Sequence, residues 1–273
     1  MAKIKIEPSK RIFDIGINEL LEFRGLIYFF VWRSVKLRYK QTIIGILWVV
    51  IQPLITMLIF TLFFGRFAKI PSNGVPYSIF VYIGLILWGY FSFSVSHASE
   101  SMIENETIIK KVYFPRLIIP ISSAFVGLID LFIASIILIG LMFYYNYIPN
   151  LFCLIYLPVF LFIMLSSSIG IGAFLASLNV KYRDIRYVLP FFIQILMFLT
   201  PVIYPSSIVS AKYKFLFYLN PMTGVIENAR DVILGLNSVN LQSLLFSFLA
   251  AIFIFIFGLF YFRKTESFFA DII

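Results

Sequence analysis

The sequence contains few residues of the kinds that support metal or thiol chemistry. Among its 273 residues there is one cysteine, Cys153, and one histidine, His97. A single cysteine excludes an intrachain disulfide, and a single histidine excludes a metal site built from several histidines. We therefore expect no disulfide scaffold, no metal ligands and no catalytic residues in this chain.

Charged residues are also scarce. They make up 13% of the chain, whereas 61% of the residues are hydrophobic and 19% are aromatic. A soluble domain carries about a quarter charged residues, so this composition excludes a soluble globular enzyme and a disordered chain. It predicts an all-α integral membrane protein. Residues 1–25 lack a continuous apolar core followed by a cleavage site, so we expect no removable signal peptide.

Long apolar runs predict six transmembrane helices, because about 20 apolar residues cross the hydrocarbon core of a bilayer. The runs do not alternate with a period of two, which favours helices over the strands of a barrel. The predicted spans are 43–64, 77–98, 117–145, 151–178, 187–204 and 241–262.

The basic residues indicate how these spans are oriented. With a cytoplasmic N-terminus, 17 of the 22 Lys and Arg residues lie inside and five outside, and nine of them precede Ile43. Such an excess of cations marks the cytoplasmic side. We expect both termini inside. We interpret the net charge of +9 as reflecting basic residues that orient the spans in the bilayer, rather than residues that bind nucleic acid. Residues 1–42 then form a cytoplasmic N-terminus, and residues 43–273 form one six-span domain.

Residues 14–40 predict an amphipathic helix that lies in the membrane interface. Its apolar face carries Leu20, Phe23, Ile27, Val31 and Val35, and the opposite face carries Asn18, Glu22, Arg33, Lys36 and Lys40. Arg24 and Arg38 interrupt the apolar face.

Two other segments outside the spans are distinctive. Residues 99–115 are polar, have helical character and end at a proline; they form either a solvated connector or a helix that docks a cytoplasmic partner. Residues 205–240 are interrupted by Pro205 and Pro221 and include a predicted helix at 225–234. This pattern indicates short external helices that enter the membrane without crossing it.

Three acidic residues are candidates for function. Asp130 is the only acid deep within a predicted span, where a carboxylate can serve a proton or substrate path. Because no basic partner is evident in the spans, we favour a carboxyl satisfied by neighbouring hydroxyls or kept protonated. Glu227 and Asp231 flank Arg230 and could bind a cation, but we favour a solvated helix face with a local Glu–Arg pair.

The aromatic and small residues of the spans suggest packing. Most aromatics are interpreted as interfacial anchors or lipid-facing filler, although aromatic rings could also line a path for sugar rings. Trp88 lies in the middle of a predicted span, where packing or a pathway is favoured over anchoring. The small residues of the fourth span predict close helix packing; these are Ser166, Ser167, Ser168, Gly170 and Gly172.

Several motifs together resemble the membrane subunit of type-2 ATP-binding-cassette exporters, in particular the polysaccharide and polyol-phosphate export permeases such as those for O-antigen or teichoic acid. The motifs occur in family-like order and spacing along nearly the full chain. They are residues 38–48 (RYKQTIIGILW), 110–116 (KKVYFPR), 178–184 (LNVKYRD), 201–205 (PVIYP) and 220–222 (NPM).

The resemblance implies a transport subunit that pairs with a second copy of itself and with two ATPase subunits on another polypeptide. ATP and magnesium would then be bound by the partner, which agrees with the absence of a G-x-x-x-x-G-K-[ST] motif here. Residues 14–40 would rest on the ATPase as an interface helix, and residues 99–115 would hold the coupling helix. The implied coupling residues are Glu100, Glu104, Glu106, Lys110 and Lys111.

The resemblance also implies a substrate and its path. The substrate would be a glycan on an undecaprenyl diphosphate lipid, exported across the bacterial cytoplasmic membrane. Arg33, Arg38 and Lys40 would contact the diphosphate near the cytoplasmic entrance. The implied external gate consists of Pro201, Tyr204, Pro205, Pro221, Glu227 and Arg230.

Other functions stay open at this point. Export of teichoic acid, of capsule, or of a drug or small lipid would use the same type of permease. A membrane-embedded transferase acting on polyprenyl phosphates belongs to a different class, and it normally needs clustered carboxylates. The acids Glu100, Glu104 and Glu106 have no second acidic cluster opposite them in the sequence, which argues against a transferase.

Overall fold

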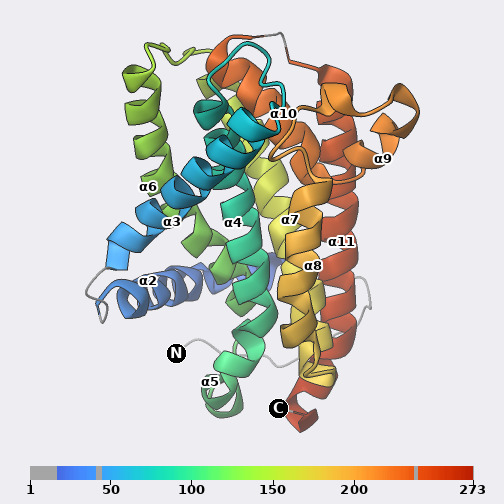
Figure 1. The fold of residues 1–273 in the computed structure, drawn as a ribbon. Coiled ribbons are helices and arrows are strands. Elements are labelled where there is room, and N and C mark those ends of the chain that lie inside the picture. The colour runs from blue at the N-terminus through green and yellow to red at the C-terminus, as the bar shows by residue number, and fades with distance from the viewer. Residues whose placement is uncertain (1–16, 41–44, 237–238, 273) are drawn as a thin grey trace.

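The computed structural model describes residues 17–40, 45–236 and 239–272, and every long regular element within these ranges is an α-helix. Figure 1 shows a bundle of long helices with one helix, α2, lying across its lower part. The helices are α1 (Ile17–Glu22), α2 (Arg24–Lys40), α3 (Gly45–Phe60), α4 (Tyr77–Glu104), α5 (Glu106–Lys111), α6 (Ile118–Tyr144), α7 (Cys153–Lys181), α8 (Ile185–Leu199), α9 (Lys214–Tyr218), α10 (Pro221–Leu234) and α11 (Leu241–Ile272).

The predicted membrane helices are largely confirmed. Among the described residues, five helices are long and apolar enough to cross a bilayer: residues Leu47–Phe67, which join α3 to a π-helical turn at Thr61–Phe67, and then α4, α6, α7 and most of α11. The remaining predicted span, 187–204, contains the 15-residue helix α8, which ends at Leu199. The count of six therefore stays a prediction. The start of the first span at Ile43, and with it the boundary between residues 42 and 43, lies outside the described residues.

Helix α4 is the axis of the bundle. It packs against α3, α6, α7, α8 and α10, and most of its side chains are buried. Since its sequence is apolar on nearly every face, enclosure by other helices is the arrangement expected for it. Tyr82 and Ile83 are fully buried near its middle.

Helices α7 and α11 pack side by side along most of their length. The contact is closest at Gly170 and Gly258, where a Cβ on Gly258 would overlap the Gly170 carbonyl, and a Cβ on Gly170 would lie 2.6 Å from the Ile254 carbonyl oxygen. Gly172 similarly meets Ala98 of α4. The prediction that small residues of this span permit close packing is confirmed.

Helix α2 packs on the bundle through a second apolar cluster, at the end of the bundle where α5 lies, which we call the α5 end. Leu20, Phe23 and Ile27 of the predicted apolar face pack there, but the most buried side chain of α2 is Phe30, which was not assigned to that face. The remaining surface of α1 and α2 is not uniformly polar, because large apolar side chains are exposed on it as well. These are Leu21, Tyr28, Phe29, Trp32 and Leu37.

The segments between spans differ from the prediction in their boundaries. Helix α4 continues to Glu104, so Glu100 and Glu104 belong to it, and only residues Glu106–Lys111 form the separate short helix α5. At the opposite end, which we call the α10 end, α10 begins at Pro221 rather than at residue 225. Pro221 occupies the first turn, and the Asn220 side chain caps it by accepting a bond from the Met222 amide. Figure 1 places α9 and α10 at this end, away from α5.

Candidate functional site

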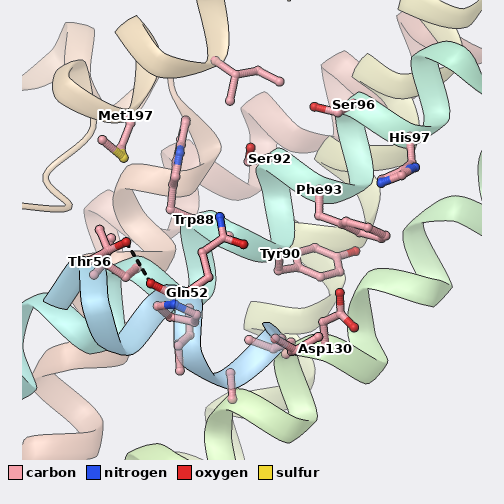
Figure 2. Close-up of a pocket in the computed structure, with 18 of the residues that line it drawn as sticks. Gln52, Thr56, Trp88, Tyr90, Ser92, Phe93, Ser96, His97, Asp130 and Met197 are labelled. Atoms are coloured by element: carbon pink, nitrogen blue, oxygen red, sulfur yellow. Dashed lines mark hydrogen bonds between the residues drawn. The ribbon is translucent and has the colours of Figure 1, made fainter. Parts of the chain in front are cut away.

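A cavity of about 560 Å³ opens between α3, α4, α6 and α8. Figure 2 shows Gln52 and Thr56 of α3 facing Trp88 of α4 and Met197 of α8, with Asp130 of α6 farther along the cavity. Trp48, Gln52 and Thr56 recur every four residues, so one face of α3 forms one wall. This face is available because α3 contacts the bundle on one side only.

The wall of the cavity combines aromatic rings with uncharged polar groups. Trp48 and Trp88 lie among the amides of Gln52 and Gln194 and the hydroxyls of Ser92, Ser96 and Thr56. Trp88 is 4% exposed and yet borders the cavity, whereas Trp48 is 55% exposed. Trp88 is therefore packed in the bundle and also borders the cavity, and its part in a pathway stays a prediction. A wall of this kind suits a ligand with many hydroxyls and flat apolar faces.

An ion pair closes one end of the cavity. Arg38 of α2 donates through Nη1 to Oδ2 of Asp130 at 2.6 Å, and the hydroxyl of Tyr39 donates to Oδ1 at 2.5 Å. The guanidinium also lies 4.3 Å from the centre of the Phe93 ring. The interpretation of Asp130 as an acid without a basic partner was therefore wrong. Its partner comes from the helix outside the spans, 92 residues away in the sequence.

The three predicted diphosphate contacts are not brought together. Arg38 borders the cavity, but Arg33 lies toward the α5 end, where its Nη1 donates to Oδ1 of Asn105 at 3.1 Å. Lys40 is exposed at the end of α2. His97 is exposed to the cavity and its ring lies 4.2 Å from that of Phe93. Of the predicted set, only Arg38 is built into the site.

At the α10 end, Arg230 joins three segments. Its guanidinium is 3% exposed and donates to the carbonyls of Phe80 at 2.9 Å, Pro201 at 2.6 Å and Val202 at 2.5 Å. It also lies 3.8 Å from the centre of the Phe80 ring. The expectation of a solvated helix face was therefore wrong for Arg230. This side chain is a buried connector between α10, α4 and the turn after α8.

The other predicted gate residues surround this connector. Pro201, Pro205 and Pro221 are buried, and the Tyr204 hydroxyl donates to the Phe198 carbonyl at 3.0 Å. Burial raises the pKa of the Glu227 carboxyl, and one of its oxygens is buried without a hydrogen-bond partner among the described residues. The predicted gate residues thus form one cluster, and their gating role stays a prediction.

The predicted coupling residues lie at the α5 end. Glu104, Lys110 and Lys111 are exposed, and Lys110 pairs with Glu106 at 2.6 Å, which lowers the pKa of that carboxyl. Their coupling to a partner stays a prediction. In the described ranges, no group of three or more His, Cys, Asp or Glu residues is arranged to hold a metal ion.

A charged network at the α5 end was not found from the sequence. Arg116 donates from Nη1 to the Glu266 carbonyl at 2.5 Å and from its backbone amide to the Glu266 carboxylate at 3.3 Å. Arg263 pairs with Glu266 at 2.9 Å and with Glu19 of α1 at 3.5 Å. The network ties the segment after α5 to α11 and α1. Only the tertiary fold brings residues this far apart in the chain together.

We expect Glu266→Ala to lower the stability of the purified chain by about 1–2 kcal/mol, because the part-buried Arg263 loses a charged partner and the Arg116 backbone amide loses its acceptor. Glu22→Ala is the matched control, since Glu22 is exposed on α1. Thermal unfolding in detergent measures both. Equal unfolding midpoints for the two variants would contradict the network's contribution.

Comparison with known proteins places the chain among transport proteins. The family model described as ABC-2 type transporter matches residues 25–234, which is well over half of the chain. The matched region includes α2, the cavity, the charged pair and α10.

Individual relatives are more distant but extend along most of the chain. It is 26% identical over 241 residues to an O-antigen export system permease protein of Klebsiella pneumoniae, which covers 88% of this chain and 92% of that protein. It is 26% identical to an O-antigen export system permease protein of Myxococcus xanthus, covering 79% and 83%. It is 25% identical to the polysialic acid transport protein of Escherichia coli, covering 74% and 78%.

Proposed function

Because the chain belongs to the ABC-2 type transporter family, we propose that it is the membrane subunit of an exporter that moves a lipid-linked polysaccharide across the bacterial cytoplasmic membrane. Membership makes it a transport subunit rather than an enzyme, and it implies an ATPase partner. In our proposal the partner binds ATP and magnesium, so this chain itself needs no cofactor. The relatives named for O-antigen export and polysialic acid transport support a polymeric glycan as cargo.

The cavity is the observation that carries the choice of a glycan. Its tryptophan rings can stack on the apolar faces of sugars, while Gln52, Gln194 and the serine hydroxyls can exchange hydrogen bonds with sugar hydroxyls. None of these groups is charged, so they can bind one sugar unit of the polymer, release it and then bind the next unit. A polymer can therefore slide past this wall without being gripped.

The remaining parts have matching roles in this proposal. The α5 end faces the cytoplasm, where α5 docks in the ATPase and α2 lies at the inner membrane surface. Two copies of the chain pair so that their cavities face each other, which would cover the exposed apolar side chains of α3 and α8. The cluster around Arg230 forms the external gate.

We expect Trp48→Ala to reduce glycan export about threefold to tenfold, because stacking of a ring is worth about 0.5–1.5 kcal/mol. Trp48 is exposed and lines the cavity. Phe132→Ala is the matched control, since Phe132 is 70% exposed on α6 and does not line the cavity. Export is measured as surface polysaccharide in cells that carry the permease, its ATPase and the glycan synthesis enzymes. Equal export by both variants would contradict the role of the cavity.

The division of labour with the ATPase is tested by purification. Coexpression with the cognate ATPase should yield a stable complex that hydrolyses ATP, whereas the purified chain alone should not. Crosslinking in native membranes should trap a pair of permease copies. Hydrolysis by the chain alone, or crosslinking that yields only monomers, would contradict the proposal.

A transferase function is distinguished by its products. Simultaneous replacement of Glu100, Glu104 and Glu106 by alanine in a transferase should abolish formation of the lipid-linked polymer. In an exporter, the same replacement should leave finished polymer accumulated on the inner side of the membrane. Lipid extraction followed by glycan analysis of inverted vesicles separates the two results.

A further inference from the structure

The ion pair at the end of the cavity combines a strong anion-binding group with an anion of the protein itself. Arg38 and Tyr39 both direct donors at the Asp130 carboxylate, at 2.6 and 2.5 Å. A phosphate has the same preference for a guanidinium and a hydroxyl donor, and it carries more charge and more acceptor oxygens. The two donors that hold the carboxylate would therefore also suit a phosphate.

We propose that Asp130 is a built-in competitor that holds the anion site of Arg38 and Tyr39 until the phosphate of a lipid-linked substrate displaces it. The proposal rests on the function proposed above and adds the residue that keeps the site closed. Its ligand is a phosphate or diphosphate ester on a polyprenyl lipid.

Three features of the site support an exchange of partners. Both side chains border the cavity, and the Arg38 side chain is 34% exposed, so a ligand in the cavity can reach it, whereas the Asp130 side chain is 14% exposed. The Phe93 ring lies 4.3 Å from the guanidinium and can keep it in place when its partner changes. His97 of α4 borders the same end of the cavity, beside Phe93, and offers a further donor.

The location favours a phosphate carried by a lipid over a free one. The site lies where α2, which crosses the bundle, meets α6, and the cavity beside it is bounded by four apolar helices. A polyprenyl chain can remain in the membrane while its phosphate reaches Arg38. The pair Arg38–Asp130 also links α2 to α6, so displacement of Asp130 would loosen α2 from the bundle when substrate arrives.

The test compares how wild-type and variant permease bind a polyprenyl diphosphate in detergent. Each permease is purified in complex with the ATPase. Binding is followed as the rise in the thermal midpoint with ligand concentration, each variant being compared with its own ligand-free midpoint. Asp130→Asn should reach half of the maximal rise at about tenfold lower concentration than wild type, because a competing charged hydrogen bond is removed. Asp130→Glu, which keeps the competitor, should resemble wild type, and Arg38→Gln should show no rise.

Controls and alternative ligands make the result decisive. Asp184→Asn and Arg24→Gln remove exposed charges away from the cavity and should behave as wild type. A rise in the thermal midpoint with inorganic pyrophosphate alone, without a lipid, would identify a free phosphate as the ligand and overturn the lipid assignment. Equal half-maximal concentrations for wild type and Asp130→Asn, or a retained rise in Arg38→Gln, would overturn the competitor role.

The test of Asp130 and the test of the proposed function can fail independently of each other. If the cargo is not a polysaccharide, cells will export no glycan even though Asp130→Asn binds the diphosphate more tightly. If Asp130 is not a competitor, glycan export will proceed while wild type and Asp130→Asn bind the diphosphate alike.

Discussion

Arg230→Met will destabilise the chain by about 3–5 kcal/mol and abolish export. Each buried carbonyl that loses its donor costs about 1–3 kcal/mol, and Arg230 serves three of them, on Phe80, Pro201 and Val202. Methionine fills much of the space but donates no hydrogen bond. The thermal midpoint of the purified complex and the surface glycan of cells measure the two effects.

Two further variants define the cause of this loss. Arg230→Lys keeps the charge but lacks the planar fork that reaches several carbonyls, so an intermediate loss is expected. Arg66→Met removes an exposed arginine and should be silent. A wild-type midpoint for Arg230→Met would contradict the connector role.

Gly84 offers an independent route to the same defect. A Cβ on Gly84 would overlap the Arg230 guanidinium and lie 2.9 Å from the Val202 carbonyl oxygen. Gly84→Ala should therefore displace Arg230 and lower the midpoint without removing any polar group.

Gly258→Ala will prevent accumulation of folded permease in the membrane. The added methyl group would overlap the carbonyl of Gly170, which is backbone and cannot move aside as a side chain could. Helices α7 and α11 would have to separate along an extensive contact, at a cost above the about 1–3 kcal/mol of ordinary overpacking.

Gly140→Ala is the matched control for this experiment. Gly140 lies on an exposed face of α6, and nothing lies within 4 Å of a Cβ placed there. Because alanine favours helix over glycine by about 0.5–1 kcal/mol, this variant should be as stable as wild type or slightly more so. Similar membrane levels of the two variants, measured by immunoblot and by size-exclusion profile in detergent, would show that the α7–α11 contact tolerates a methyl group.

Local pattern was sufficient for the elements whose length and apolar character are continuous. The spans around α4, α6, α7 and α11, and the helix outside the spans, α2, followed from runs and periodicity, because those depend on neighbouring residues only. The family resemblance predicted functional residues at both ends of the bundle. Among them, the residues predicted to form the gate do lie close together.

The interactions that define the site were not predictable in the same way. Arg38 was expected to interrupt the apolar face of its helix and, by the family resemblance, to contact a diphosphate. Its contact with Asp130 was missed because it depends on how α2 crosses α6, and no pattern within either helix encodes that crossing. Arg230 looked solvated because it lies between two acids, and its burial follows from carbonyls left open by the turn after α8. In both cases the deciding partner belongs to a distant segment.

The shortness of α8 has a consequence for the surrounding bilayer. At about 1.5 Å per residue, its 15 residues rise about 22 Å, whereas a hydrocarbon core is about 30 Å thick. If α8 crosses the bilayer as predicted, and its far end faces outside as proposed, the turn at 200–204 lies below the level of the outer headgroups, where the bilayer can relieve the hydrophobic mismatch by thinning locally. In the proposed function this thinning would lie beside the cavity, where the polar cargo crosses the membrane. Transport should therefore slow as the acyl chains of reconstituted vesicles lengthen.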